Sequence, residues 1–519
     1  MQTRRDQVQA HLFTLSRVQA GLIRGEPDAP ETPMRRFALG TAAGALAAVV
    51  AVAGFAAFGF ISPGSSRAFQ KEGTLVVVKD NGSRYLYLGG ALRPVANRSS
   101  ALLITGRSAL TPRTVTAKAI RKVPRGPAVG IPGAPEGLPG ARDLDRGRWV
   151  VCSTEADDGQ GGRVPVVTVH AGGRPEGLRA LDADEALRVV PAPGPAAGGA
   201  EGAGTEFVAW NGRRFEATSR NALTALGLAN VRALPVGPAW LNTLTAGPDL
   251  AQDDVPDRGE PGITVGGVAT RIGQVLRDDT NGNHFLVWRA GITPMTRTEA
   301  ALVLGDPRTA PAYPGGVPVA VGVNAAAVAR TAITERPLNE AGLPAVPPRP
   351  VADPGTGSLA PCAEVEPGGG AERRAAVRLA VRDAADGPEG SAGPAAGGGV
   401  LADRVVVPAG RGVLAQVEST AGDVSPTLFL ITDAGVKYPL ATPDVAKTLG
   451  YGTAAAVTLP SRVLALVPTG PVLDPEAAKR PSAADPGRAP APAATTGTSP
   501  SGTPSRGRSR SRRSLRCQV

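Results

Sequence analysis

Residues 37–61 contain no charged side chain and read FALGTAAGALAAVVAVAGFAAFGFI. As a helix rising 1.5 Å per residue, this stretch is about 37 Å long, enough to cross a hydrocarbon core of about 30 Å. A cleaved signal peptide is the competing interpretation, but it requires a short basic leader. Here 36 residues precede the stretch. The sequence therefore predicts one transmembrane helix that remains as an anchor.

Basic residues on the two sides of the span favour one orientation. Four lie within 20 residues before it and three within 20 after it: Arg17, Arg24, Arg35 and Arg36, then Arg67, Lys71 and Lys79. This slight excess favours a cytoplasmic N-terminus. We expect a single-pass protein of the plasma membrane whose C-terminal bulk lies outside the cytoplasm.

The segment before the span, residues 1–36, is itself patterned. Its apolar residues follow helical spacing on one face: Val8, Leu12, Leu15, Val18 and Leu22. Such an amphipathic helix either rests on the inner leaflet or docks a cytoplasmic partner. The sequence leaves both interpretations open.

Two of the three cysteines lie in strand-like contexts, Cys152 in RWVVCST and Cys362 in LAPCAEV. Outside the cytoplasm such a pair is expected to oxidise. The bond would close a loop of about 211 residues, a stabilisation of about 5 kcal/mol from chain entropy. Two unrelated buried thiols are the alternative. Cys517 lies in the terminal tail.

Internal similarity is strong beyond the span. Residues 81–86 (NGSRYL) match 281–286 (NGNHFL), and residues 211–215 (NGRRF) parallel 434–438 (AGVKY). Self-similarity of this kind indicates a repeated structural unit.

Each copy contains a glycine followed three residues later by an aromatic side chain. The pairs are Gly82 and Tyr85, Gly212 and Phe215, Gly282 and Phe285, and Gly435 and Tyr438. An Asn-Gly pair between apolar runs favours a two-residue hairpin turn with positive φ at both positions. The aromatic side chain then falls in the second strand and faces the core. An Ala/Leu segment that starts at Ser or Thr and ends at Gly predicts a short capped helix after each hairpin.

The predicted fold class is α+β, with four β-hairpin/helix repeats in an elongated region around a split central domain closed by the disulfide. We place the repeats at 70–125, 205–250, 262–335 and 425–474, and the central halves at 147–190 and 360–420. Within these halves we expect helices at 182–190 and 362–382 and a hairpin at 402–418. Residues 125–147 resemble a linker, and 475–519 a disordered basic tail.

The net charge of +11 is concentrated at the two ends of the chain. Residues 1–36 and 474–519 contribute +2 and +6, so the 437 residues between them carry only +3. This distribution argues against a nucleic-acid partner.

Catalytic motifs do not emerge from the sequence. The three histidines, His11, His170 and His284, lie far from the cysteines, and the Gly-Lys dipeptide of a Walker A loop does not occur. The turn at 278–283 (DDTNGN) lacks the spacing and closing Glu of a calcium loop. We therefore expect no catalytic residue, metal or cofactor.

The opening TRRDQVQAHLFTLSRVQAGLIRGEPD, the single span after Arg36, the four repeats and the two spaced cysteines resemble the EccB family. The resemblance covers Gln2 to about Asp474. It implies a core membrane component of actinobacterial type VII (ESX) secretion systems that assembles with the EccC-type motor ATPase, EccD and EccE and self-associates as a dimer. The family also carries an ATPase designation.

Three hypotheses follow. The first is a non-catalytic scaffold in a secretion complex that bridges the membrane core and the cell envelope. The second is a tether whose repeats bind the cell wall, although only 19 aromatic residues are available for sugar stacking. The third is a nucleotide hydrolase without a familiar motif.

Overall fold

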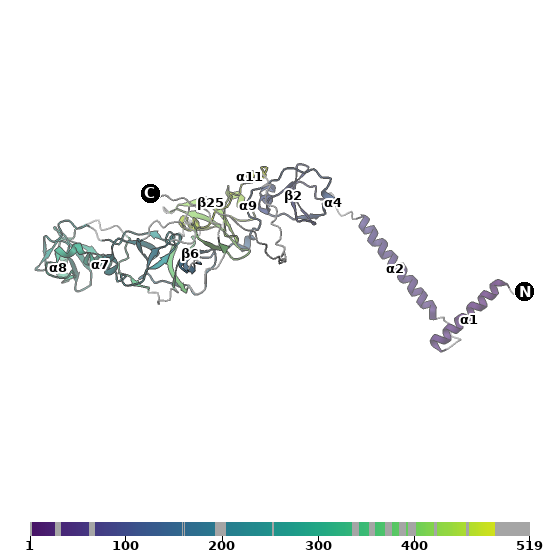
Figure 1. The fold of residues 1–519 in the computed structure, drawn as a ribbon, viewed down its shortest axis with the longest axis horizontal. Helices are drawn as coiled ribbons and strands as arrows, with labels where there is room; N and C mark the ends of the chain where they lie inside the picture. The colour runs from purple at the N-terminus through teal and green to yellow at the C-terminus, as the bar shows by residue number, and fades with distance from the viewer. Residues whose placement is uncertain are drawn as a thin grey trace, which may run out of the picture. The chain divides into compact units, whose positions relative to one another are not determined.

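The computed structural model describes most of the chain (Figure 1). The described residues are 3–25, 33–61, 68–157, 159, 161–192, 204–251, 254–334, 342–351, 359–368, 376–383, 391–392, 401–419, 423–452 and 456–482. The tail predicted for 475–519 lies outside them from residue 483 onward.

Two long helices precede the sheets. Helix α1 (Arg4–Arg24) begins at Thr3, whose backbone N–H and hydroxyl both donate to the carboxylate of Asp6, and ends at Gly25 with a φ of 72°. Helix α2 (Pro33–Ile61) contains the window Phe37–Phe55, which is long and apolar enough to cross a membrane. None of that window is buried within the described structure.

Four sheet units follow one topology, in which the strand order is third, second, first, fourth. The first strand pairs antiparallel with the second and parallel with the fourth. A helix follows the third strand, and a second short helix follows the fourth. The third and fourth strands run in the same direction. A tight turn joins only antiparallel strands, so the helix between these two strands serves as the crossover connection.

Unit 1 comprises β1 (Thr74–Val78), β2 (Arg84–Leu88), β3 (Ala91–Pro94), α3 (Arg98–Thr105), β4 (Arg113–Val115) and α4 (Ala117–Ile120). Unit 2 comprises β8 (Glu185–Pro191), β9 (Glu206–Trp210), β10 (Arg213–Ala217), α5 (Arg220–Ala225), β11 (Leu234–Val236) and α6 (Pro238–Leu241). Two short strands, β12 (Thr245–Ala246) and β19 (Arg349–Pro350), extend its sheet.

Unit 3 comprises β15 (Val275–Asp278), β16 (His284–Val287), β17 (Ile292–Met295), α7 (Arg297–Gly305), η2 (Pro307–Ala312), β18 (Val321–Val323) and α8 (Ala325–Ala329). A hairpin of β13 (Pro261–Val265) and β14 (Val268–Arg271) precedes it. Unit 4 comprises β24 (Gly412–Glu418), β25 (Val424–Thr432), β26 (Lys437–Pro439), α9 (Pro443–Thr448), β27 (Val457–Pro460) and α10 (Ser461–Leu464).

Only one of the Asn-Gly turns has the predicted geometry. Asn211 and Gly212 form a two-residue turn with φ values of 49° and 73°. At Asn81 the connection from β1 to β2 is longer, and the Asn81 side chain accepts a hydrogen bond of 3.1 Å from the backbone N–H of Ser83. Asn281 makes the same contact with Asn283 at 2.9 Å. This local side-chain bond offers the turn an alternative to positive φ at asparagine.

A seven-stranded sheet joins two distant parts of the chain in the order β22-β23-β6-β5-β20-β21-β7. Its strands are β5 (Trp149–Asp157), β6 (Arg163–His170), β7 (Arg179–Ala180), β20 (Leu359–Glu366), β21 (Ala376–Asp383), β22 (Ser391–Ala392) and β23 (Arg404–Val406). Units 2 and 3 lie between β7 and β20 in sequence. The two parts meet where β5 pairs with β20.

Several expected elements differ from the structure. The stretch 182–190, predicted as a helix, contains strand β8, and the described residues of 362–382 form strands β20 and β21, with 369–375 outside them. β20 is buried on both faces, so its sequence lacks the alternation that marks a one-sided strand. β8 is a strand because it pairs with β9 and β11. The predicted hairpin at 402–418 is split, since β23 pairs with β6 whereas β24 pairs with β25. β8 and β24, which lie within the predicted central halves 147–190 and 360–420, pair with the strands of units 2 and 4.

Two segments expected to be irregular pack against the sheets. Ile131 and Leu144, in the predicted linker, are buried in the core of unit 4. Helix α11 (Pro475–Lys479), in the predicted tail, buries Ala478 and lies against α3. The main core lies between the central sheet and helices α6 and α10.

Candidate functional site

The centre of the seven-stranded sheet contains a disulfide. Cys152 of β5 and Cys362 of β20 are directly opposite each other in the antiparallel register, with Cα atoms 4.1 Å apart, and they form the bond that the sequence predicts. Both are fully buried. The bond fastens the two parts of the sheet across 210 residues of sequence.

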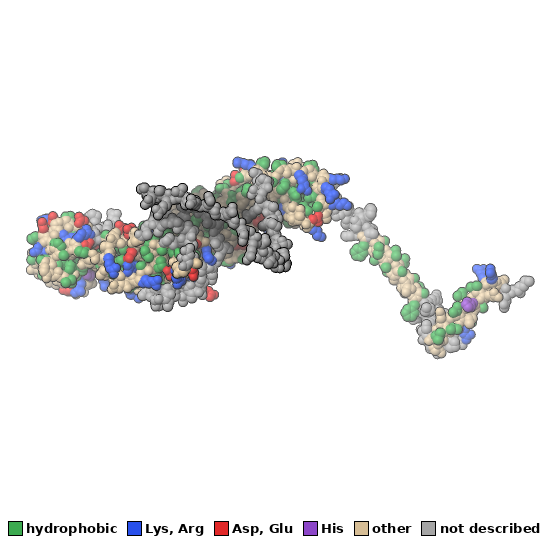
Figure 2. Space-filling model, in the orientation of Figure 1, with side chains coloured by type: hydrophobic (Ala, Val, Ile, Leu, Met, Phe, Trp, Pro, Cys, Tyr) green, Lys and Arg blue, Asp and Glu red, His purple; other side chains and the backbone are tan. Residues whose placement is uncertain are grey.

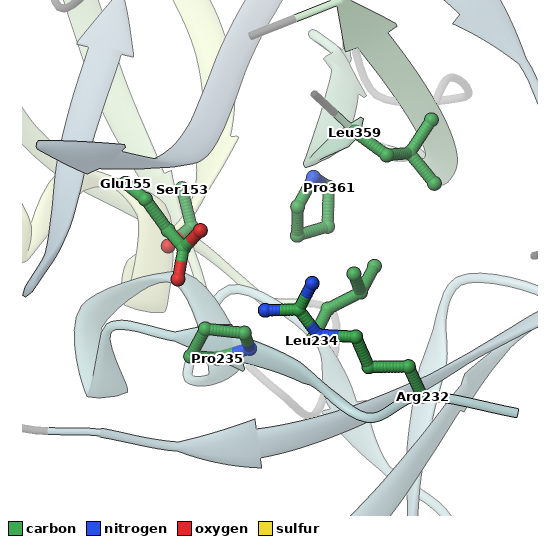
Figure 3. Close-up of a pocket in the computed structure, with 7 residues that line it drawn as sticks. All are labelled: Ser153, Glu155, Arg232, Leu234, Pro235, Leu359 and Pro361. Atoms are coloured by element: carbon green, nitrogen blue, oxygen red, sulfur yellow. The ribbon is translucent and has the colours of Figure 1, made fainter. Parts of the chain in front are cut away.

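A small pocket is lined in part by residues that neighbour the two cysteines in sequence (Figure 3). It is lined by Ser153, Glu155, Arg232, Leu234, Pro235, Leu359 and Pro361. The Ser153 hydroxyl accepts a hydrogen bond of 3.1 Å from the backbone N–H of Gly237, and Glu155 lies 3.9 Å from the Arg163 guanidinium. The lining contains no histidine that could activate this serine. The pocket thus lies between β5, β20 and the β11 segment of unit 2. Its lining places no base in contact with the Ser153 hydroxyl.

Over the described residues, no group of three or more His, Cys, Asp or Glu side chains could hold a metal ion. His284 lies in β16 and His170 in β6, in separate sheets. Burial, together with Arg297 and Arg277, lowers the pKa of His284.

Equivalent cations bind the ends of α6 and α10. Arg214 of β10 donates to the carbonyl of Leu241 at 3.3 Å and to the side chain of Asn242 at 2.5 Å. Lys437 of β26 donates its Nζ to the carbonyl of Leu464 at 2.6 Å. A cation at this position satisfies the carbonyls that a helix end leaves without partners. Burial lowers the pKa of Arg214 and lowers that of Lys437 to about 8.

Neighbouring units also contact each other through their longer helices. Helices α5 and α7 pack so closely that a Cβ on Gly305 would lie 2.5 Å from the Cβ of Ala225. Units 2 and 4 are joined by the Arg462 guanidinium, which donates to the carbonyl of Thr243 at 2.6 Å. The Tyr451 hydroxyl donates to the carbonyl of Pro139 at 2.8 Å.

The predicted repeat residues occupy turns and cores. The four glycines have positive φ: Gly82 69°, Gly212 73°, Gly282 76° and Gly435 71°. The aromatic side chains are buried: Tyr85 8%, Phe215 0%, Phe285 8% and Tyr438 5% exposed. Tyr85 and Phe285 lie in second strands, whereas Phe215 and Tyr438 lie in third strands. An alignment of all four copies on this motif is therefore shifted by one strand: it matches the second strand of units 1 and 3 to the third strand of units 2 and 4.

The apolar stripe of helix α1 is exposed to solvent within the described structure. Val8, Leu12 and Val18 are 58%, 60% and 54% exposed. Arg17 lies over the Phe13 ring at 5.9 Å. The stripe has the spacing the sequence indicates and contacts nothing that buries it within the described residues.

These features define a class: a protein in which the described residues hold one helix long and apolar enough to cross a membrane, followed by sheet units built around a disulfide-closed sheet. The family described as "Type VII secretion system ESX-1, transport TM domain B" matches residues 1–484. The chain therefore belongs to the EccB family, as the resemblance in its sequence indicates.

Individual relatives agree with this assignment. The chain is 30% identical over 487 residues to "ESX-3 secretion system ATPase EccB3" of Mycolicibacterium smegmatis, covering 90% of this chain and 89% of the relative. It is 33% identical over 280 residues to "ESX-5 secretion system ATPase EccB5" of Mycobacterium tuberculosis (strain ATCC 25618 / H37Rv). That match spans about half the length of each chain, 52% in both cases.

Solved structures show the same fold. A chain of an intact ESX-5 inner membrane complex matches with a TM-score of 0.62 and 27% identity, covering 95% of this chain and 98% of that one. The EccB3 dimer from the ESX-3 core complex matches with a TM-score of 0.60 and 25% identity, covering 78% of this chain and 100% of that one.

Sequence reasoning missed the cations at the helix ends and the tyrosine at position 451. A signal for the first was present, because Arg214 and Lys437 both directly precede the aromatic residue of the repeat. The hydrogen bond from Tyr451 spans 312 residues and leaves no local pattern.

Proposed function

We propose that this chain is a non-catalytic, single-pass scaffold subunit of a type VII secretion complex. The observation that carries this proposal is the shared core, in which residues of the central sheet, unit 2 and unit 4 form one buried cluster. A core shared by separate stretches of chain fixes the surfaces of those stretches relative to one another. A subunit on which other subunits assemble requires such rigidly held surfaces.

Its proposed topology places the N-terminus in the cytoplasm and the bulk of the chain outside the plasma membrane. The disulfide supports this side, because disulfides persist in oxidising compartments. The matching structures include one described as the periplasmic assembly of the ESX-5 inner membrane complex, with 27% identity and a TM-score of 0.61.

We further propose that the four units are copies of one ancestral unit, with boundaries that follow the sheets. Their common strand order supports this, as do offsets of 200 residues between units 1 and 3 and 223 between Arg214 and Lys437. The proposed partners are an EccC-type motor ATPase, EccD, EccE and a second copy of this chain.

Native gels of detergent extracts test the scaffold role. We expect the chain to migrate with the other core subunits, and its deletion to abolish the motor complex. An intact motor complex in the deletion strain would refute the proposal. Removal of residues 1–36 separates cytoplasmic docking from external assembly, because only the cytoplasmic contacts are lost.

The relatives' names include the word ATPase, so the purified chain is also assayed for ATP hydrolysis. Turnover that persists through further chromatography, and that follows this chain through the column fractions, would replace the scaffold proposal with the hydrolase.

A further inference from the structure

The positive charge of the folded part is concentrated in unit 1. Residues 68–126 contain eleven Lys and Arg against Glu72 and Asp80, a net charge of +9. The equivalent stretch of unit 3, residues 268–326, contains five basic and four acidic residues, a net charge of +1. The near-neutral total between the two ends of the chain therefore conceals one strongly basic unit.

These cations face solvent and few are neutralised. Ten of the eleven are exposed: Lys71, Lys79, Arg84, Arg98, Arg107, Arg113, Lys118, Arg121, Lys122 and Arg125. Arg84 pairs with Glu136, and within the described residues the others form no ion pair. Arg125 stacks on Tyr85 at 5.3 Å, which leaves its charge unneutralised. Figure 2 shows Lys and Arg side chains gathered over this unit.

Four of the cations lie around α4, and we call Lys79, Lys118, Arg121 and Lys122 the α4 cluster. Lys118 lies within the helix, and Arg121 and Lys122 follow its last residue. The backbone brings Lys79 alongside: its N–H donates to the Val115 carbonyl at 2.8 Å, and the next residue, Asp80, accepts from the N–H of Ala117 at 2.8 Å.

The chain enters unit 1 at this same helix. Phe69 is 1% exposed and packs in one small core with Ile120 of α4. Seven residues separate Phe69 from the end of α2 near Ile61, and such a segment reaches at most about 25 to 30 Å. The tether therefore holds the α4 cluster close to the surface of the membrane that α2 enters.

We propose that the α4 cluster binds the anionic phospholipid headgroups of the membrane in which α2 is anchored. The chemistry is that of phosphate groups facing a lysine- and arginine-rich surface. The short tether keeps the effective headgroup concentration high, so modest attraction per residue is enough. The proposal rests on α2 spanning the membrane, and it adds a second contact that orients unit 1.

Energy transfer to the bilayer tests it on the full-length chain in vesicles. A dye is placed at Ala117→Cys in a Cys517→Ser background, where Cys152 and Cys362 remain joined in the disulfide. The acceptor is a headgroup-labelled lipid. The vesicles are phosphatidylcholine alone or phosphatidylcholine mixed with phosphatidylglycerol.

We expect stronger transfer with phosphatidylglycerol than with phosphatidylcholine alone, and its fall to the phosphatidylcholine level at about 1 M salt, where the Debye length is about 3 Å. Lys118→Gln/Arg121→Gln/Lys122→Gln should lower the ratio of docked to undocked unit about a hundredfold. The matched control, Arg220→Gln/Arg297→Gln/Arg330→Gln, removes the same charge from exposed positions of units 2 and 3 and should leave transfer unchanged.

Equal transfer in both vesicles, or full transfer in the α4 triple variant, would overturn the proposal. Salt-sensitive transfer that requires the other secretion subunits would also overturn it, in favour of an acidic protein partner. Labelling of Ala117→Cys with an impermeant maleimide in intact cells reports separately on topology. A failure of lipid binding is therefore distinguishable from a failure of the proposed orientation.

Discussion

Units 2 and 4 differ from units 1 and 3 in how they use the helix after the fourth strand. In units 2 and 4, helices α6 and α10 contribute Trp240, Leu241, Val463 and Leu464 to the core beneath the central sheet. In unit 1, α4 contributes Ile120 to the core of its own sheet. In unit 3, α8 contributes Ala327 in the same limited way.

The same strand order therefore places its last helix in two different environments: in the main core in units 2 and 4, and against its own sheet in units 1 and 3. Where the central sheet covers it, the helix contributes two large apolar side chains to the main core and its end is bound by a cation. In unit 1 the helix packs only on its own sheet through Ile120, and α4 carries Lys118 on its exposed side. The side chains of this helix therefore differ between units according to what the helix packs against, although the topology is the same.

Removal of the disulfide is expected to have the largest effect on this comparison. Cys152→Ala/Cys362→Ala should lower the free energy of unfolding by about 5 kcal/mol, because the bond closes a loop of 210 residues. Chemical denaturation of the oxidised wild type and the double variant measures it. Reduction of the wild type should reproduce the loss, and Cys517→Ser, outside the disulfide, should not.

Truncation of the core residue that the last helix contributes should have different effects in the two pairs of units. Trp240→Ala, at a fully buried position of α6, should cost about 3 to 5 kcal/mol and expose amides of β5, β6 and unit 2 to exchange. Ile120→Ala in α4 should raise exchange only within unit 1. Uniform loss of protection by both variants would contradict the separation.

Sequence reasoning reached the features that local physics fixes. Lack of charge identified the long apolar helix α2, the cysteine contexts identified the disulfide, and Gly212 with Asn211 identified a two-residue turn. Each depends on a few neighbouring residues. Ser219, the expected cap of α5, accepts the N–H of Ala222 at 3.2 Å for the same reason.

Long-range pairing was beyond the sequence. The cysteine pair predicted that the two central halves meet, but the parallel fourth strands and the antiparallel register of β5 with β20 depend on contacts across many residues that no local pattern specifies. Ala376–Asp383 reads as a helix because it is rich in Ala and Arg, yet pairing with β20 and β7 makes it a strand. The charge of unit 1 was present in the sequence, but it was averaged away over the whole folded region.

The close approach of α5 and α7 gives a smaller effect. Gly305→Val should destabilise the contact of units 2 and 3 by about 1 to 3 kcal/mol, because the added atoms would overlap Ala225. Limited proteolysis of the segment between units 2 and 3 should accelerate. The double variant Gly305→Val/Ala225→Gly restores space, and its failure to recover resistance would show that packing at this point is not the cause.

The cations at the helix ends of units 2 and 4 give the smallest effect, and only the effect of Lys437 depends on pH. Burial holds the pKa of Lys437 at about 8, below its ordinary value of 10.5. Between these values the unfolded chain binds more protons than the folded one, so stability rises with pH, by about 1 kcal/mol from pH 8 to 9. Lys437→Met should abolish that rise in urea denaturation. Arg214 stays protonated throughout this range, so Arg214→Met should retain it. Equal pH dependence in the wild type and Lys437→Met would mean that Lys437 keeps its proton in the fold, and that the two helix ends are bound by permanent charges alike.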